Sequence, residues 1–304
     1  MEIKTVAIIG LGALGVLYAD QMTRMLPEGM CRVVADQTRI ARYRREGVYC
    51  NGRACSLTYA DRAQAQEPVD LLIFATKFNG LQDAIDAAQG IVGPQTTVVS
   101  LLNGISSERY LSLAFGAEKV LYCVAQGMDA VKEGNHLTYH SMGYLIFGDA
   151  EGKPNPRADA LDAFLRRVEV PHLLAQDMQR RLWHKLLLNV GVNQACTVFH
   201  RDYGGVQASG QPRETMISAM REVLAVAQVE GIPLTEADLD SMVKLVDSLN
   251  PAGKPSMLQD AEAKRPSEVE LFGGTIVRLG RKHGIPTPFN DFLYKAIKDM
   301  EAAY

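Results

Sequence analysis

Short apolar runs alternate with helix-compatible stretches in the first half of the chain, whereas long amphipathic stretches fill the second half. The first arrangement is typical of a parallel β-sheet covered by crossover helices. It predicts strands at residues 5–9, 32–35, 71–75, 97–101 and 120–124, and helices at 14–26, 39–46 and 80–91. We expect residues 136–140 and 143–147 to add an antiparallel hairpin.

Beyond residue 174 strand-like runs nearly vanish, and the pattern becomes helical. It predicts helices at residues 177–199, 215–230, 235–249, 267–283 and 290–303. Gly-Ile-Pro occurs at 231–233 and again at 284–286, where glycine ends a helix and proline prevents its continuation. The chain should therefore form two domains, residues 1–176 and 177–304.

Composition excludes several classes of protein. The 304 residues include 32 Lys plus Arg and 35 Asp plus Glu, a net charge of −3, which argues against a nucleic-acid partner. The five cysteines are odd in number and contain no C-x-x-C pair, so neither a disulfide scaffold nor a zinc ribbon is expected. No run resembles a signal peptide or a membrane span, so we expect a cytoplasmic protein without a membrane partner. His136 and His140 fall in a predicted strand, and no metal site is expected.

A glycine motif follows the first predicted strand and opens the first helix. It has the form G-x-G-x-x-G and consists of Gly10, Leu11, Gly12, Ala13, Leu14 and Gly15. The first glycine permits a tight turn, the second lets backbone approach a pyrophosphate, and the third allows close contact between helix and strand. The helix N-terminus then offers N–H groups to phosphates. Strand, turn, helix and second strand in this order favour dinucleotide binding over a glycine-rich turn without chemical consequence.

Asp36 ends the second predicted strand, 21 residues after Gly15. A carboxylate there can accept hydrogen bonds from the adenosine ribose, which favours NAD over NADP. Arg39 and Arg42 follow closely, and a guanidinium could instead pair with a 2′-phosphate. The alternative is that both arginines lie on an exposed helix face.

Lys185, Asn189 and Asn193 repeat every four residues within an otherwise apolar predicted helix. This spacing places them on one helix face, where desolvated polar groups require partners. The face could simply be the solvent side of an amphipathic helix. Alternatively, lysine can donate a proton and asparagine can hold hydroxyl and carboxylate oxygens. Lys77 and Asn103 each follow a buried strand, at the sheet edge where open α/β sheets bind ligands.

Ser256 and Glu268 are further polar candidates near the C-terminus. Ser267 is suited to cap the helix predicted from that residue, which would place Glu268 in its first turn, where the helix dipole favours a carboxylate. A functional role for Glu268 instead requires it to face Lys185.

These motifs together resemble the ketopantoate reductase (2-dehydropantoate 2-reductase) family over nearly the whole chain. The resemblance rests on the glycine motif, 75–77, 102–104, Trp183 with the Lys-Asn-Asn line, 256–260, Glu268 and 278–288. It implies an α/β fold with an N-terminal Rossmann-like doubly wound sheet and a C-terminal all-helical domain. It also implies reduction of a branched 2-oxo acid by NADP(H), with NAD(H) possible because of Asp36, and a homodimer.

The resemblance also implies roles for individual residues. Lys185 would be the general acid, and Glu268 would contact the lysine and the cofactor ribose. Substrate would be held by Asn189, Asn193, Ser256 and Asn103. Cofactor would be bound by the motif at 10–15, Asp36, Lys77, Asn103 and Glu268.

Two departures from the family pattern leave alternatives open. Members that use NADPH commonly carry a basic residue where Asp36 stands, and Gly273 replaces an asparagine after Glu268. One alternative is therefore a related dehydrogenase of another 2-hydroxy or 3-hydroxy acid. A second is a regulator that senses NAD(P) without catalysis, although a sensor has no use for the Lys-Asn-Asn line.

Overall fold

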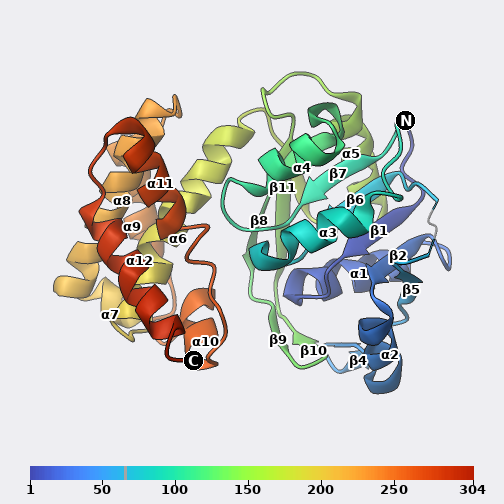
Figure 1. The fold of residues 1–304 in the computed structure, drawn as a ribbon, viewed down its shortest axis with the longest axis horizontal. Coiled ribbons are helices and arrows are strands. Elements are labelled where there is room, and N and C mark those ends of the chain that lie inside the picture. The colour runs from blue at the N-terminus through green and yellow to red at the C-terminus, as the bar shows by residue number, and fades with distance from the viewer. Residues whose placement is uncertain (65–66) are drawn as a thin grey trace. The chain divides into compact units, whose positions relative to one another are not determined.

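The computed structural model describes residues 1–64 and 67–304 of the protein. The chain divides into two compact units, of which the first holds residues 1–102 and 106–178 and the second holds 103–105 and 179–304. All strands of the described residues belong to the first unit (Figure 1). Residues 103–105 belong to the helical unit, although they follow a strand of the first unit (β7, Thr97–Ser100) closely in the sequence.

The main sheet of the first unit is doubly wound. Within the described residues its order is β12-β11-β8-β7-β6-β1-β2-β5. The strands are β1 Val6–Ile9, β2 Cys31–Ala35, β5 Thr58–Asp61, β6 Leu71–Phe74, β7 Thr97–Ser100, β8 Val120–Met128, β11 Met142–Gly148 and β12 His172–Leu174. Neighbours from β5 to β8 are parallel, whereas β11 is antiparallel to β8 and parallel to β12. The chain therefore winds outward from β1 on both sides.

The expected hairpin of residues 136–140 and 143–147 is wrong. β10 (His136–Thr138) belongs instead to a second sheet of order β4-β3-β10-β9, with β3 Tyr49–Cys50, β4 Arg53–Ala54 and β9 Val131–Glu133. β11 joins the main sheet, where Leu145, Ile146 and Phe147 are buried. β10 buries only Leu137, so it lacks the apolar residues that a strand of the main sheet needs.

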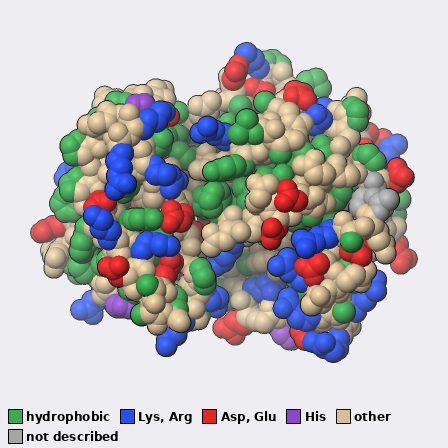
Figure 2. All heavy atoms as spheres, in the orientation of Figure 1, with side chains coloured by type: hydrophobic (Ala, Val, Ile, Leu, Met, Phe, Trp, Pro, Cys, Tyr) green, Lys and Arg blue, Asp and Glu red, His purple; other side chains and the backbone are tan. Residues whose placement is uncertain are grey.

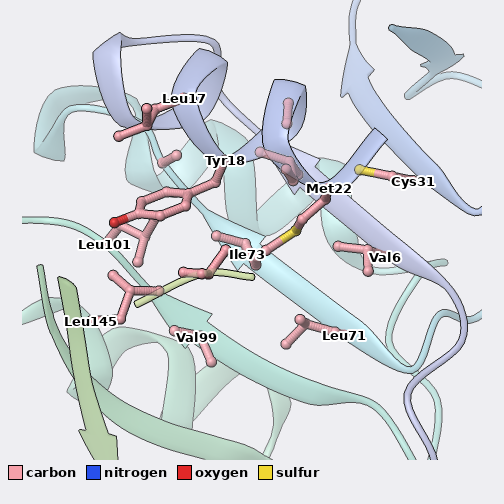
Figure 3. Packing of buried hydrophobic residues seen from close by; sticks show 14 of the residues in the cluster. Val6, Leu17, Tyr18, Met22, Cys31, Leu71, Ile73, Val99, Leu101 and Leu145 are labelled. Carbon is pink, nitrogen blue, oxygen red and sulfur yellow. The ribbon is translucent and has the colours of Figure 1, made fainter. Parts of the chain in front are cut away.

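Helices cover both faces of the main sheet. They are α1 Ala13–Met25, α2 Gln37–Glu46, α3 Leu81–Ala88, α4 Ser107–Phe115 and α5 Pro156–Arg167, with 3₁₀ turns η1 Phe78–Gly80 and η2 Ala117–Lys119. Because side chains alternate along a strand, Val6 and Ile8 enter one apolar cluster while Ala7 and Ile9 enter another. Figure 3 shows the first cluster, in which Met22 of α1 lies over the strands.

The second unit is helical. Its elements are α6 Met178–Val198, α7 Tyr203–Gln207, α8 Gln211–Val229, α9 Glu236–Ser248, α10 Ser256–Glu262, α11 Gly273–His283 and α12 Pro288–Glu301. α11 begins six residues after the predicted start, because Ser267 makes tertiary contacts. Its N–H and hydroxyl both donate to Glu301 of α12, and its Oγ accepts the N–H of Val269. None of the helices within residues 1–64 and 67–304 combines the length and apolar character required to cross a bilayer.

A bidentate ion pair joins α8 to α9. Arg213 donates through Nη1 to Oδ1 of Asp247 at 2.7 Å and through Nη2 to Oδ2 at 2.9 Å. The hydrogen bond from Arg213 lowers the pKa of Asp247 below its ordinary value of 3.8. Since a lowered pKa in the folded state stabilises the fold only while the carboxyl is ionised, this contribution is present at neutral pH and lost as the pH falls through the lowered pKa.

We expect Asp247→Asn to reduce the free energy of unfolding by about 0.5–1 kcal/mol at neutral pH, the range for a partly exposed pair. The difference should shrink toward zero when both proteins are unfolded in urea at a pH below the lowered pKa, where the wild-type carboxyl is also neutral. Asp240→Asn, at an exposed position of the same helix, is the control. If Asp247→Asn lowered the free energy of unfolding by the same amount at acidic and neutral pH, the stabilisation would not come from the ionised carboxyl of Asp247.

Candidate functional site

The glycine turn of the first unit is held by close backbone contacts. Gly10 has φ +100°, and a Cβ there would lie 2.7 Å from the carbonyl carbon and oxygen of Ala75. A Cβ on Gly15 would lie 2.0 Å from the carbonyl oxygen of Gly10. At Gly12 the nearest atom to such a Cβ is the oxygen of Ala75, at 3.5 Å. The first and third glycines therefore serve packing, whereas the second leaves an open approach to the backbone.

This turn can accommodate a phosphate-bearing cofactor. α1 starts directly after Gly12, which supplies no side-chain cap, and its first turn contains no acidic residue. Its N-terminus follows β1, which lies beside β6, and strand order reverses between these two strands. Open α/β sheets bind ligands at such a point. After β6, Lys77 is exposed, and the hydroxyl oxygen of Thr76 is buried without a hydrogen-bond partner in the described chain.

Asp36 follows β2 at the same edge of the sheet and also caps α2. Its Oδ1 accepts the N–H of Arg39 at 2.8 Å, and its Oδ2 lies 3.5 Å from Nε of Arg39. The guanidinium of Arg42 lies over the ring of Tyr43. Figure 2 shows Lys and Arg side chains gathered over the end of the first unit that carries α2. Sequence reasoning missed the capping role, which a helix start at residue 37 would have indicated.

The second unit brings three of the predicted residues together. Nζ of Lys185, on α6, donates to Oδ1 of Asn103 at 2.9 Å. Nδ2 of Asn103 in turn donates to Oε2 of Glu268 at 2.7 Å. All three side chains are partly buried. An ammonium, a carboxamide and a carboxylate from distant parts of the sequence thus form one hydrogen-bonded chain.

The other polar residues of α6 contact the start of α10. Oδ1 of Asn193 accepts the backbone N–H of Met257 at 3.2 Å and the hydroxyl of Ser256 at 3.4 Å. Its Nδ2 donates to Oδ1 of Asn189 at 3.3 Å. Asn193 is only 5% exposed, so this line enters the interior of the unit and is not a solvent face. Sequence reasoning missed Met257, because a backbone N–H carries no signal in the residue type.

Glu268 does not lie in the first turn of a helix, so the dipole explanation for it is wrong. It occupies a turn that precedes α11, and its backbone carbonyl accepts the N–H of Leu271. Gly104, with φ +88°, packs on this turn, and a Cβ there would lie 3.3 Å from Cβ of Leu271. The glycine beside Asn103 thus lets the two segments approach each other.

The described residues offer neither a reactive thiol at Cys196 nor a cluster of metal ligands. Cys196 is buried, and burial raises the pKa of its thiol to about 12, so it remains a neutral thiol near pH 7. Within the described residues there is no group of three or more His, Cys, Asp or Glu side chains arranged to hold a metal ion.

A doubly wound sheet with an open glycine turn, followed by a helical unit with a lysine–amide–carboxylate chain, has the architecture of a two-domain oxidoreductase. Residues 6–152 match the family described as ketopantoate reductase PanE/ApbA, and residues 177–301 match its C-terminal domain. The chain belongs to this family of NAD(P)-dependent oxidoreductases.

Individual relatives are similar over nearly their whole length. A 2-dehydropantoate 2-reductase of Aquifex aeolicus is 25% identical over 302 residues, which cover 97% of this chain and 96% of the relative. A solved D-mandelate dehydrogenase with NADH and anilino(oxo)acetate has a TM-score of 0.87 at 21% identity, covering 98% of this chain and 99% of that one. A dimeric ketopantoate reductase from Staphylococcus aureus has a TM-score of 0.79 at 20% identity, with coverage of 98% and 99%.

The packing of the turn predicts opposite outcomes for two glycines. Gly15→Ala should cost more than about 3 kcal/mol of unfolding free energy, because its Cβ would meet a backbone oxygen that cannot move aside. Gly12→Ala should stay within about 1 kcal/mol of the wild type, because its Cβ finds ordinary contact distance. Denaturant unfolding of both variants measures the difference, and equal costs would refute this division of roles.

Proposed function

We propose that this protein reduces the carbonyl group of a branched 2-oxo acid to a 2-hydroxy acid with NADPH or NADH. The favoured substrate is ketopantoate, whose product, pantoate, serves pantothenate and CoA biosynthesis. The observation that carries the proposal is the chain from Lys185 through Asn103 to Glu268. It provides a proton donor, the ammonium of Lys185, that is held by the amide of Asn103. That amide has one possible orientation, because its oxygen must face the ammonium and its nitrogen must face the carboxylate of Glu268.

An N-terminal domain of residues 1–176 is proposed to hold the cofactor. The backbone of residues 10–15 would bind the pyrophosphate, Asp36 the adenosine ribose, and Lys77 would lie beside the cofactor. The open N-terminus of α1 supports this assignment. The bound nicotinamide supplies the hydride for the reaction.

A C-terminal domain of residues 177–304 is proposed to bind the substrate and, through Lys185, to donate the proton. Negative charge develops on the carbonyl oxygen as the carbonyl is reduced, and an ammonium can stabilise and protonate it. Asn103 accepts from Nζ of Lys185 and donates to Glu268, so its two amide atoms orient the ammonium relative to the carboxylate. Lys185 is therefore the proposed general acid. Glu268 is also proposed to contact the cofactor ribose. Asn103 is proposed to contact both the cofactor and the substrate.

Substrate binding is assigned to the rest of the polar line. Asn189 and Ser256 would contact the substrate's hydroxyl and carboxylate, together with Asn193 as the family resemblance implies. Partial burial of Asn189 supports this, because hydrogen bonds strengthen where water is excluded. We also propose a homodimer, which the dimeric relative supports, and a cytoplasmic location, which suits five cysteines that form no disulfide in the described part of the chain.

A related dehydrogenase of another 2-hydroxy acid is the second candidate. The solved D-mandelate dehydrogenase shares the fold over 98% of this chain and carries NADH. Comparison of turnover with ketopantoate and with phenylglyoxylate separates the two candidates, because the better substrate has the higher kcat/KM.

We expect Lys185→Ala to lower kcat for ketopantoate by about 10²–10⁴-fold, the usual contribution of a general acid. Reduced nicotinamide absorbance measures turnover, and fluorescence titration should show NADPH or NADH binding within about threefold of the wild type. Lys244→Ala, at an exposed position of α9, is the control. Wild-type binding of cofactor with no turnover of any 2-oxo acid would instead indicate a sensor.

We expect Asp36→Asn to raise the ratio of kcat/KM with NADPH to that with NADH by about tenfold. Asparagine keeps the cap of α2 but removes the charge that repels a 2′-phosphate. Initial rates with each cofactor give the ratio for both proteins. An unchanged ratio would show that Asp36 does not face the ribose.

A further inference from the structure

Two residues of α12 hold the turn that carries Glu268. Tyr294 and Glu301 are two helical turns apart, on one face of that helix. The backbone N–H and the hydroxyl of Ser267 donate to Oε1 of Glu301 at 2.7 and 2.6 Å. The hydroxyl of Tyr294 donates to Oε1 of Glu270 at 2.7 Å. Glu268 thus lies between two residues that are anchored to the same helix.

The chain is held differently on the two sides of Glu268. After it, Val269 and Leu271 are each 1% exposed, so burial of their side chains fixes the chain there. Before it, residues 262–266 are exposed and contribute no such burial. The contact between Ser267 and Glu301 is therefore the anchor on the N-terminal side of the turn, one residue before Glu268.

The carboxylate of Glu301 fixes the direction of these bonds, because it can only accept. The hydroxyl of Ser267 must donate to it, which leaves a lone pair to accept the N–H of Val269 at 3.2 Å. Burial alone would raise the pKa of Glu301, but the hydrogen bonds from Ser267 and Lys298 outweigh it and lower that pKa below its ordinary value of 4.5. The carboxyl is therefore ionised at neutral pH.

We propose that Glu301 is a positioning residue, which fixes the carboxylate of Glu268 by holding Ser267. The carboxylate then faces Asn103, whose Nδ2 lies 2.7 Å from Oε2 of Glu268. This inference rests on the proposed function, in which Asn103 orients the ammonium of Lys185. A shift of about 1 Å in such a site can lower turnover by up to about 100-fold. Glu301 acts on the reaction only through this turn.

Glu301→Leu tests the proposal, because leucine has a similar size and accepts no hydrogen bond. We expect kcat for ketopantoate to fall about tenfold, because Glu268 is no longer held toward Asn103. KM should stay within about threefold, because Asn189 and Ser256, two of the proposed substrate contacts, belong to α6 and α10. A kcat within about twofold of the wild type, or a larger change in KM than in kcat, would overturn the proposal.

Glu301→Gln separates the hydrogen bonds from the charge. Oε1 of Glu301 alone accepts both donors of Ser267, and glutamine retains one such oxygen. We therefore expect kcat within about threefold of the wild type. A fall as large as that of Glu301→Leu would assign the effect to the charge, and the proposal would fail. Asp299→Leu, at an exposed position of the same helix, is the control and should leave kcat unchanged.

A double-mutant cycle separates positioning from general damage to the fold. If Glu301 acts through Glu268, Glu301→Leu should lower kcat about tenfold in the wild-type chain but less than about twofold in the Glu268→Ala chain. A merely structural role predicts the same tenfold loss in both chains. That result would overturn the proposal.

Ser267→Ala is the second variant, in case Glu301→Leu does not fold. Alanine removes the hydroxyl and keeps the backbone N–H that donates to Glu301, so kcat should fall about fivefold, the effect of one hydrogen bond. Ser267→Thr retains a hydroxyl and should stay within about twofold of the wild type. If the alanine and threonine variants have equal kcat, Ser267 does not transmit the effect of Glu301 and the proposal fails.

Crystal structures distinguish this inference from the proposed function, because they show Glu268 whether or not the protein turns over a 2-oxo acid. Suppose that the wild type reduces no 2-oxo acid, but its Glu268 contacts Asn103 and lies more than about 4 Å from it in Glu301→Leu. The proposed function then fails, and the positioning of Glu268 by Glu301 stands. If the contact persists in Glu301→Leu, or is missing in the wild type, the inference fails whatever the activity.

Discussion

The backbone of residues 10–15 runs so close to the end of β6 that two of its positions have no room for a side chain. A Cβ at position 10 would collide with the carbonyl group of Ala75, and a Cβ at position 15 would collide with the carbonyl oxygen of Gly10. This contact fixes where α1 starts, and with it the direction in which its first N–H groups point. In the proposed function this turn binds the cofactor phosphates through backbone N–H groups, since it contributes no charged side chain.

A different constraint organises the second unit. Lys185, Asn189 and Asn193 share a helix with buried apolar residues, so each requires a hydrogen-bond partner. The partners come from Asn103, which follows β7 in the sequence, and from the start of α10. Because a carboxamide donates on one side and accepts on the other, a partner at one end determines what is offered at the other end. The same contacts that satisfy these buried groups thus also fix which way each amide is turned.

Family membership and geometry bear on different questions. The match over both parts of the chain establishes the fold and the class of oxidoreductase. A solved D-mandelate dehydrogenase shares the fold at 21% identity, so the fold by itself does not determine the substrate. In the proposed function, Asp36 determines the preference between NADH and NADPH, and the amides of α6 determine the preference among substrates.

The order of strands and helices in the first half was predictable from sequence, because strands buried on both faces are continuous apolar runs and the glycine motif has a fixed spacing. The helical character of the second half and the alignment of Lys185, Asn189 and Asn193 on one face likewise follow from periodicity. Tertiary structure alone decided that β10 joins a separate sheet, that α11 begins at Gly273, and that Asn103 connects Lys185 with Glu268. These outcomes depend on contacts between distant segments, which leave no local pattern in the sequence.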